Sequence, residues 1–179
     1  MNSSLMKPVF GLFLYLVIST LAHSQTGRFQ QAINYQMDVN LDVKTNQYTG
    51  SQVIFYTNNS PDTLDRVFFH LYYNAFQPGS MMDERSRSIS DPDKRVADRI
   101  AKLKPTEVGY LHISQIKMNG ESVKFTEEET VLVVYLDNPI FPNSTVKFES
   151  EFNGQVPLQI RRSGRDGAEG VRYSISQWY

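Results

Sequence analysis

Hydrophobic and polar residues alternate along much of the chain. In residues 33–43 (INYQMDVNLDV), every second residue from Ile33 to Val43 is apolar, and the residues between them are mostly polar. A period of two predicts a strand with one buried face and one solvated face. After a turn at 44–46, residues 48–57 predict a second strand, and residues 146–152 repeat the alternation.

Other segments predict further strands. Residues 64–76 (LDRVFFHLYYNAF) and 131–136 are apolar on both faces, which is typical of the interior of a sheet. Asn119-Gly120 separates two short apolar runs and predicts a hairpin turn. Residues 171–179 indicate a final strand. About eight strands at hairpin spacing predict an all-β fold, a twisted sheet or a sandwich.

Residues 77–108 interrupt this pattern because they are rich in charge and poor in aromatic residues. Asp91-Pro92 resembles a helix N-cap followed by proline at the first helical position. Val96, Ile100 and Leu103 then follow at helical spacing. We therefore expect one amphipathic helix from about residue 92 to 104 inside a long insertion. Such excursions often carry function.

The N-terminus has the three parts of a secretory signal peptide. Lys7 precedes an uncharged apolar run of about fifteen residues, and Ala22-His23-Ser24 places small residues at a cleavage site after Ser24. A membrane anchor is the alternative, but this run is shorter than the ~20 residues that a span requires. We expect residues 1–24 to be removed and residues 25–179 to form an exported domain, periplasmic or extracellular, without stable membrane insertion.

Composition excludes several classes of protein. The net charge is −1, with 18 basic and 19 acidic residues, so the chain has no basic surplus for binding nucleic acid. The chain contains no cysteine, which excludes disulfide scaffolds, thiolate metal sites and cysteine nucleophiles.

Residues 25–179 show no complete catalytic constellation. Their two histidines, His70 and His112, are too far apart in sequence for a zinc helix, which needs two imidazoles four residues apart. We expect His70 to be a hydrogen-bonded residue of the core or its rim, and His112 to lie at the surface. The chain contains neither a GxSxG nucleophile elbow nor a GxxxxGKS phosphate loop.

Three charged or glycine-rich segments have simpler interpretations than a site. Glu127–Glu129 predict a solvated turn, since adjacent carboxylates on a tight turn point in different directions. Arg161, Arg162 and Arg165 predict a solvated loop, with binding of an acidic partner as the alternative. The glycines at 164, 167 and 170 precede a strand and not a helix, which argues against dinucleotide binding.

Three stretches resemble a known family: HLYYNAFQPGSMMDERS (His70–Ser86), DRIAKLKPTEVGYLHI (Asp98–Ile113) and YSISQWY (Tyr173–Tyr179). With the signal peptide and the strand order, they resemble the N-terminal domain of secreted bacterial zinc metallopeptidases of family M1, the aminopeptidase N and leukotriene-hydrolase type. The resemblance covers about residues 29–179.

The resemblance implies a saddle-shaped, non-catalytic β-domain that packs on a thermolysin-like catalytic domain. In that family the zinc motif and the catalytic residues belong to the second domain, which residues 1–179 do not include. The chain alone would therefore have no catalytic residue, bind no zinc and be inactive. Its partners would be the catalytic domain of the same polypeptide and a peptide substrate.

One substrate-binding residue carries over by position. In the family, the end of the first domain offers a Gln or Glu near the free amino group of the substrate, and Gln177 matches it. An amide oxygen can accept a charge-assisted hydrogen bond from an ammonium group. The alternative is that Gln177 is a solvated strand residue.

The chain ends inside an apparent strand, so we expect it to be the front part of a longer protein. That hypothesis also predicts an exposed apolar face where the catalytic domain would pack. Two alternatives stay open. The first is a stand-alone secreted β-sandwich that binds glycans or protein, which an aromatic content of 12% favours. The second is an adhesive surface domain without a small ligand.

Overall fold

The computed structural model describes residues 29–89 and 93–179. The predicted signal peptide and the predicted cap at Asp91-Pro92 lie outside these residues. The chain divides into two units, Met1–Gln30 and Gln31–Tyr179. Of the first unit only residues 29 and 30 are described, and both lie outside regular secondary structure. The fold below is that of the second unit.

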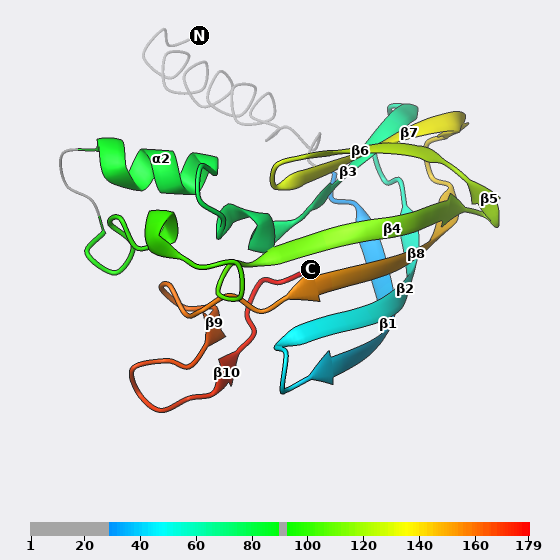
Figure 1. Ribbon diagram of the computed structural model, residues 1–179. Helices are drawn as coiled ribbons and strands as arrows, with labels where there is room; N and C mark the ends of the chain where they lie inside the picture. The colour runs from blue at the N-terminus through cyan, green and yellow to red at the C-terminus, as the bar shows by residue number, and fades with distance from the viewer. Residues whose placement is uncertain (1–28, 90–92) are drawn as a thin grey trace, which may run out of the picture. The chain divides into compact units, whose positions relative to one another are not determined.

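A five-stranded antiparallel sheet forms the larger layer, with the strand order β1-β2-β8-β4-β5 (Figure 1). Its first two strands form a long hairpin in unbroken register, because Asn46 adopts the left-handed backbone that the turn requires (φ 61°). The alternating residues predicted to share one face therefore do so. The strands are β1 (Ala32–Asp42), β2 (Gln47–Thr57), β8 (Thr145–Gln155), β4 (Tyr110–Met118) and β5 (Glu121–Ser122).

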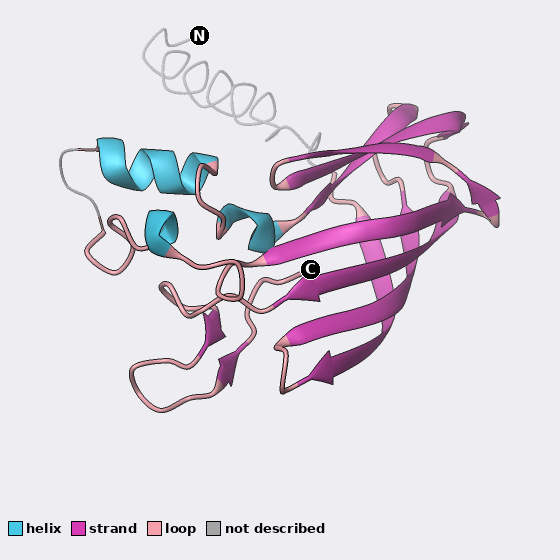
Figure 2. Ribbon diagram, viewed as in Figure 1, coloured by secondary structure: helices cyan, strands magenta, loops and turns pink. Residues whose placement is uncertain are grey.

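A three-stranded antiparallel sheet, in the order β3-β7-β6, forms the second layer. Buried side chains from both sheets form one hydrophobic core. Figure 2 shows the two groups of strands and the helical segments gathered at one end of them. The strands are β3 (Leu64–His70), β7 (Val131–Ile140) and β6 (Lys124–Glu128). This architecture confirms the all-β prediction.

The segment 64–76 is a strand only up to His70. Beyond it, Tyr72–Ala75 form a short 3-10 helix, η1. β3 is an edge strand of its sheet, so the prediction that this segment lies in the interior of a sheet is wrong. The buried apolar residues Leu71, Tyr73 and Phe76 follow the strand. Asn74 fixes this helix: its side-chain amide donates to the Glu129 carbonyl (2.9 Å), and its amide oxygen accepts from the Leu111 N–H (2.8 Å).

The prediction of a helix over 92–104 is wrong for its described part. Residues 94–99 form turns, and only Ile100–Lys102 form a short 3-10 helix, η2. Ala97 adopts a positive φ of 38°, which an α-helix does not tolerate. Val96 and Ile100 are nevertheless buried in the core, as their spacing predicted.

The α-helix of the insertion lies earlier, at α2 (Met81–Ser88). A reciprocal cap explains its start: the Ser80 hydroxyl accepts from the Asp83 N–H, and the Asp83 carboxylate accepts from the Gly79 N–H (2.9 Å). Burial opposes ionisation of Asp83, but the Gly79 N–H and the Arg87 guanidinium outweigh it and lower the pKa of this carboxyl.

The predicted final strand over 171–179 is confirmed only at Tyr173–Ser174. The glycine-rich loop holds the two-residue strand β9 (Gly164–Arg165), which pairs with β10 (Tyr173–Ser174). Residues 175–179 leave this ladder, and the left-handed backbone of Gln177 (φ 53°) redirects the chain. No helix within residues 29–89 and 93–179 is long and apolar enough to span a membrane.

Candidate functional site

One face of the five-stranded sheet is covered over half of its width and open over the other half. Phe148 of β8 is 1% exposed, because Phe69 of β3 packs on its ring (5.7 Å between centroids). On the same face of edge strand β1, Ile33 and Val39 are each 46% exposed. These β1 side chains with Tyr35 form the open strip, which is the kind of exposed apolar surface that often marks an interaction site.

The last residues of the chain lie on this open half. The Trp178 ring packs edge-to-face on Tyr48 (5.2 Å) and on Phe152 (5.8 Å). Tyr179 packs on Tyr35 (5.6 Å). Gly50 makes room for the Phe152 ring, since a Cβ there would come within 2.6 Å of it. Aromatic packing therefore fixes where the chain ends on the sheet.

Gln177 lies at the bend just before the anchored Trp178. Its side chain is exposed and makes no hydrogen bond to any residue of the described part of the chain. The structure thus gives Gln177 a fixed backbone position and a free amide group, and its binding of a substrate stays a prediction.

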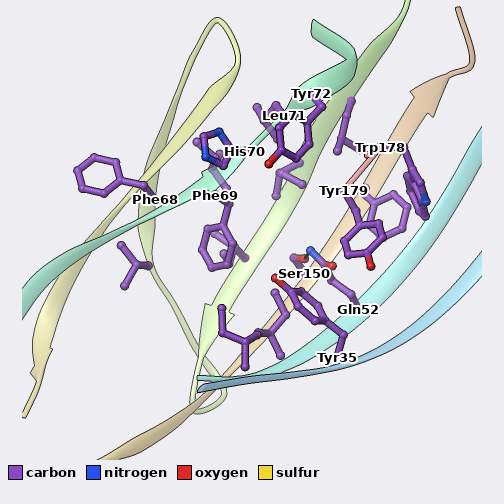
Figure 3. A pocket seen from close by; sticks show the side chains of 18 of the residues that line it. Tyr35, Gln52, Phe68, Phe69, His70, Leu71, Tyr72, Ser150, Trp178 and Tyr179 are labelled. Atoms are coloured by element: carbon purple, nitrogen blue, oxygen red, sulfur yellow. Dashed lines mark hydrogen bonds between the residues drawn. The ribbon is translucent and has the colours of Figure 1, made fainter. Parts of the chain in front are cut away.

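A cavity of about 230 Å³ opens between the two sheets beside this C-terminal segment (Figure 3). Buried aliphatic side chains from both sheets form its deep end, among them Ile54 of β2 and Leu132 of β7. Aromatic side chains form the remaining wall and the rim: Tyr35, Tyr56, Phe68, Phe69, His70, Tyr72, Phe152, Trp178 and Tyr179.

Two polar side chains face this apolar cavity. Gln52 of β2 and Ser150 of β8 are direct partners in the ladder, and the Gln52 Nε2 donates to the Ser150 Oγ (2.9 Å). Ser150 is 5% exposed. No lysine, arginine, aspartate or glutamate lines the cavity within the described residues. Burial, and then the neighbouring phenols of Tyr179 and Tyr72, raise the pKa of Tyr35.

The two histidines have separate surroundings. His70 lines the cavity and stacks on Tyr72 (5.0 Å between centroids), but its side chain is exposed and forms no hydrogen bond to the described residues, so the prediction of a hydrogen-bonded residue of the core or its rim is wrong. His112 is exposed, as predicted, but its Nδ1 lies 2.8 Å from Glu127 Oε2. Sequence reasoning missed this pair because fifteen residues separate the two.

Glu127 corrects the prediction of a solvated triple-glutamate turn. It belongs to β6, and its Oε1 accepts from the Ile113 N–H of β4 (2.8 Å). A bulge in β4 interrupts its pairing with β8 between Ile113 and Gln115. All three glutamates are exposed, but Glu127 closes one corner between the sheets through this hydrogen bond.

The arginine-rich loop is bound to the insertion rather than simply solvated. Arg161 pairs with Asp93 (3.2 Å), and the Arg165 guanidinium donates to the Thr106 carbonyl (2.8 Å). In return, Arg99 of the insertion donates to the Gln159 carbonyl (2.8 Å). Arg162 is exposed. Two of the three arginines thus have structural partners within this chain.

The described residues contain no group of three or more His, Asp or Glu side chains that could hold a metal ion. These residues therefore do not fit a zinc ion. Zinc in a catalytic domain beyond this chain stays a prediction.

The fold is similar to that of M1 zinc metallopeptidases. A mutant of a two-domain M1 zinc metallopeptidase bound to L-tryptophan matches 84% of this chain, with a TM-score of 0.50 and 15% identity. An M1 zinc metallopeptidase from Deinococcus radiodurans gives the same coverage, TM-score and identity. A mutant of the Deinococcus enzyme, bound to a Tyr-Ser-Ala substrate, matches equally well.

This chain spans only 28% of the two-domain enzyme and 27% of the Deinococcus enzyme. No protein-family model matches the sequence, and no curated protein matches it. At this identity the similarity shows a shared fold, found in those enzymes as part of a larger chain.

Proposed function

We propose that this chain is the N-terminal, non-catalytic β-domain of an exported zinc-dependent metallo-aminopeptidase whose catalytic domain follows in the same polypeptide. The fold shared with larger M1 peptidase chains carries the proposal. The hypothesis predicts an apolar face for the second domain, and the open strip on β1 is such a face. Each apolar Å² removed from water there would contribute about 25 cal/mol to docking.

Gln177 would anchor the N-terminus of the substrate. The anchored Trp178 holds its backbone in place, and its amide oxygen is free to accept from an ammonium group. Such a charge-assisted hydrogen bond contributes about 1.5–3 kcal/mol. It would fix the chain end of the peptide, so that hydrolysis occurs one residue in. Zinc in the catalytic domain would supply polarisation of the scissile carbonyl.

Reading the gene beyond the Tyr179 codon is the first test. We expect an open reading frame with an HExxH motif and a distant Glu. The full gene product should bind zinc and hydrolyse L-aminoacyl p-nitroanilides, whereas residues 25–179 alone should not. A stop codon at this point, or a continuation without the motif, would overturn the proposal.

The role of Gln177 has a test of its own in the full gene product. Gln177→Ala should raise KM for peptides with a free amino group by about tenfold or more, since each 1.4 kcal/mol is a factor of ten. Gln177→Glu should lower it, because a carboxylate binds ammonium more strongly than an amide does. Ser176→Ala, the exposed neighbour, is the matched control and should change nothing. An unchanged KM in Gln177→Ala would remove this residue from the proposal.

Export is tested separately, by fractionating cells that express the gene and sequencing the N-terminus of the mature protein. We expect the extracytoplasmic fraction and a mature chain that begins at Gln25. Retention in the cytoplasm with Met1 intact would contradict export.

A further inference from the structure

We propose that the cavity between the two sheets binds a small, uncharged aromatic molecule that carries a hydroxyl group, of about the size of a phenol. The proposal stands on the cavity itself and does not depend on a catalytic domain. Protein interiors pack as densely as organic crystals, and voids larger than a water molecule are few. A cavity of about 230 Å³ is therefore a feature to be explained. For comparison, an engineered apolar cavity of about 150 Å³ takes up benzene.

The walls fit a planar ring. Trp178, Tyr179, Tyr35 and Phe69 approach the space from three different segments of the chain (Figure 3). Aromatic rings pair best edge-to-face or offset, and rings on several sides offer both arrangements to a guest. The aliphatic deep end would receive the apolar edge of that ring.

The Gln52–Ser150 pair fits one hydroxyl group. Gln52 Nε2 already donates to Ser150 Oγ, so two capacities are left over: the Gln52 carbonyl oxygen as an acceptor and the Ser150 O–H as a donor. Neither has a protein partner among the residues that the structure describes. A ligand hydroxyl can both donate and accept, so it can satisfy the two together.

The lining excludes strongly charged ligands. A quaternary ammonium ion also prefers aromatic walls, but no carboxylate lines this cavity to balance its charge. An anion would have no arginine or lysine, and only His70 at the rim. Moving an unpaired charge into such surroundings is expensive. The chemistry that remains is neutral and aromatic with one hydrogen-bonding group.

The site has its own spectroscopic probe, because Trp178 is the single tryptophan of the chain and lines the cavity. We would titrate the exported chain with p-cresol and excite Trp178 at wavelengths where p-cresol does not absorb. We expect a saturable change in fluorescence. Toluene, which lacks only the hydroxyl, should bind more weakly by at least the value of one ordinary hydrogen bond, about three- to tenfold.

Two variants distinguish specific binding through the polar pair from non-specific binding in an apolar cavity. Ser150→Ala should lower p-cresol affinity and leave toluene binding unchanged, because the Ser150 O–H donor is lost while the Gln52 acceptor remains. Ser114→Ala, an exposed serine on β4, is the matched control and should alter neither. Val67→Phe adds a ring from β3 and should abolish binding of both. If that variant does not fold, the Ser150→Ala comparison still decides.

Three results would overturn the proposal. They are the absence of a saturable change with p-cresol, equal losses of p-cresol and toluene in Ser150→Ala, and tighter binding of tetramethylammonium than of p-cresol. A phenol group can belong to a free small molecule or to a tyrosine side chain. Binding of N-acetyltyrosinamide as tight as that of p-cresol would identify a peptide source, and its exclusion would identify a free molecule.

Discussion

The covered and open halves of the five-stranded sheet have the same sequence pattern and opposite surroundings. Apolar residues alternate with polar ones in β8 as they do in β1. Phe148 of β8 is buried beneath the second sheet, whereas Ile33 and Val39 of β1 are nearly half exposed. A period of two thus predicts which residues share a face. Whether anything covers that face depends on elements far away in the sequence.

We expect the covered half to contribute most of the stability. It is packed by β3, β6 and β7, whose apolar residues join a single core with those of β4 and β8. On the open half, the C-terminal rings are the only such packing among residues 29–89 and 93–179. Substitutions in the covered half should therefore lower the free energy of unfolding much more than substitutions in the open half.

Phe148→Ala should have the largest effect. The ring is fully buried and packs on Phe69 and Tyr56, so its removal leaves a cavity in the core. We expect a loss of about 3–5 kcal/mol in the free energy of unfolding. Urea denaturation followed by circular dichroism measures it. A loss below that of Ile33→Ala, its counterpart on the open half, would contradict the comparison.

Trp178→Ala should have an intermediate effect. It removes a half-buried ring and its edge-to-face pairs with Tyr48 and Phe152, each worth about 0.5–1.5 kcal/mol beyond burial. We expect the melting temperature to fall measurably. Tyr179→Ala removes a more exposed ring with one pair to the sheet and serves as the control with the smaller effect. Identical melting of Trp178→Ala and the unmodified protein would mean that the segment is not anchored.

Glu127→Ala should cost about 1 kcal/mol, the net value of an ordinary hydrogen bond, because the Ile113 N–H loses its acceptor. Hydrogen exchange gives a sharper measurement: the Ile113 amide should exchange faster, while amides of the β1–β2 ladder should not change. Glu128→Ala, the exposed neighbour, should alter neither quantity. Unchanged protection at Ile113 would show that Glu127 does not close this corner.

The smallest effect is expected for Val39→Thr on the open strip, within about 0.5 kcal/mol. The same substitution at Val134, which is fully buried in β7, places a hydroxyl in the core and should cost about 1–3 kcal/mol. Parallel denaturation of the two variants tests the comparison directly. Equal losses would mean that the β1 face is covered in solution.

The local elements of the fold could be predicted from the sequence. The β1–β2 hairpin follows from strict alternation around a turn, and Asn119-Gly120 forms the predicted tight turn, with both residues at positive φ. The insertion marks the limit. The spacing of Val96 and Ile100 correctly identified buried residues, but an irregular segment buries them without an α-helix. Periodicity indicates which residues are buried. A single residue with a left-handed backbone can still replace the expected α-helix by irregular structure.

The candidate site was less predictable, because it is assembled over long distances. Ser150 and Gln52 are 98 residues apart and meet only because β2 pairs with β8. Glu127 and His112 come from strands in different sheets. No local sequence motif predicts contacts between residues this far apart in the sequence. The structure places Trp178 and Tyr179 at the inter-sheet cavity, beside residues far away in the sequence.

The bulge in β4 also makes the two edges of the larger sheet unequal in their tendency to pair with another chain. Glu127 accepts from the Ile113 N–H, so this N–H on one side of the larger sheet is not available to another strand. The other side ends in β1, eleven residues without proline or lysine, with a partner on only one side within the described residues. Unpaired edges of this kind are where foreign strands add. Fibrils or strand-exchanged dimers grown at high concentration would therefore start from Ala32–Asp42, and a single lysine placed there would delay them.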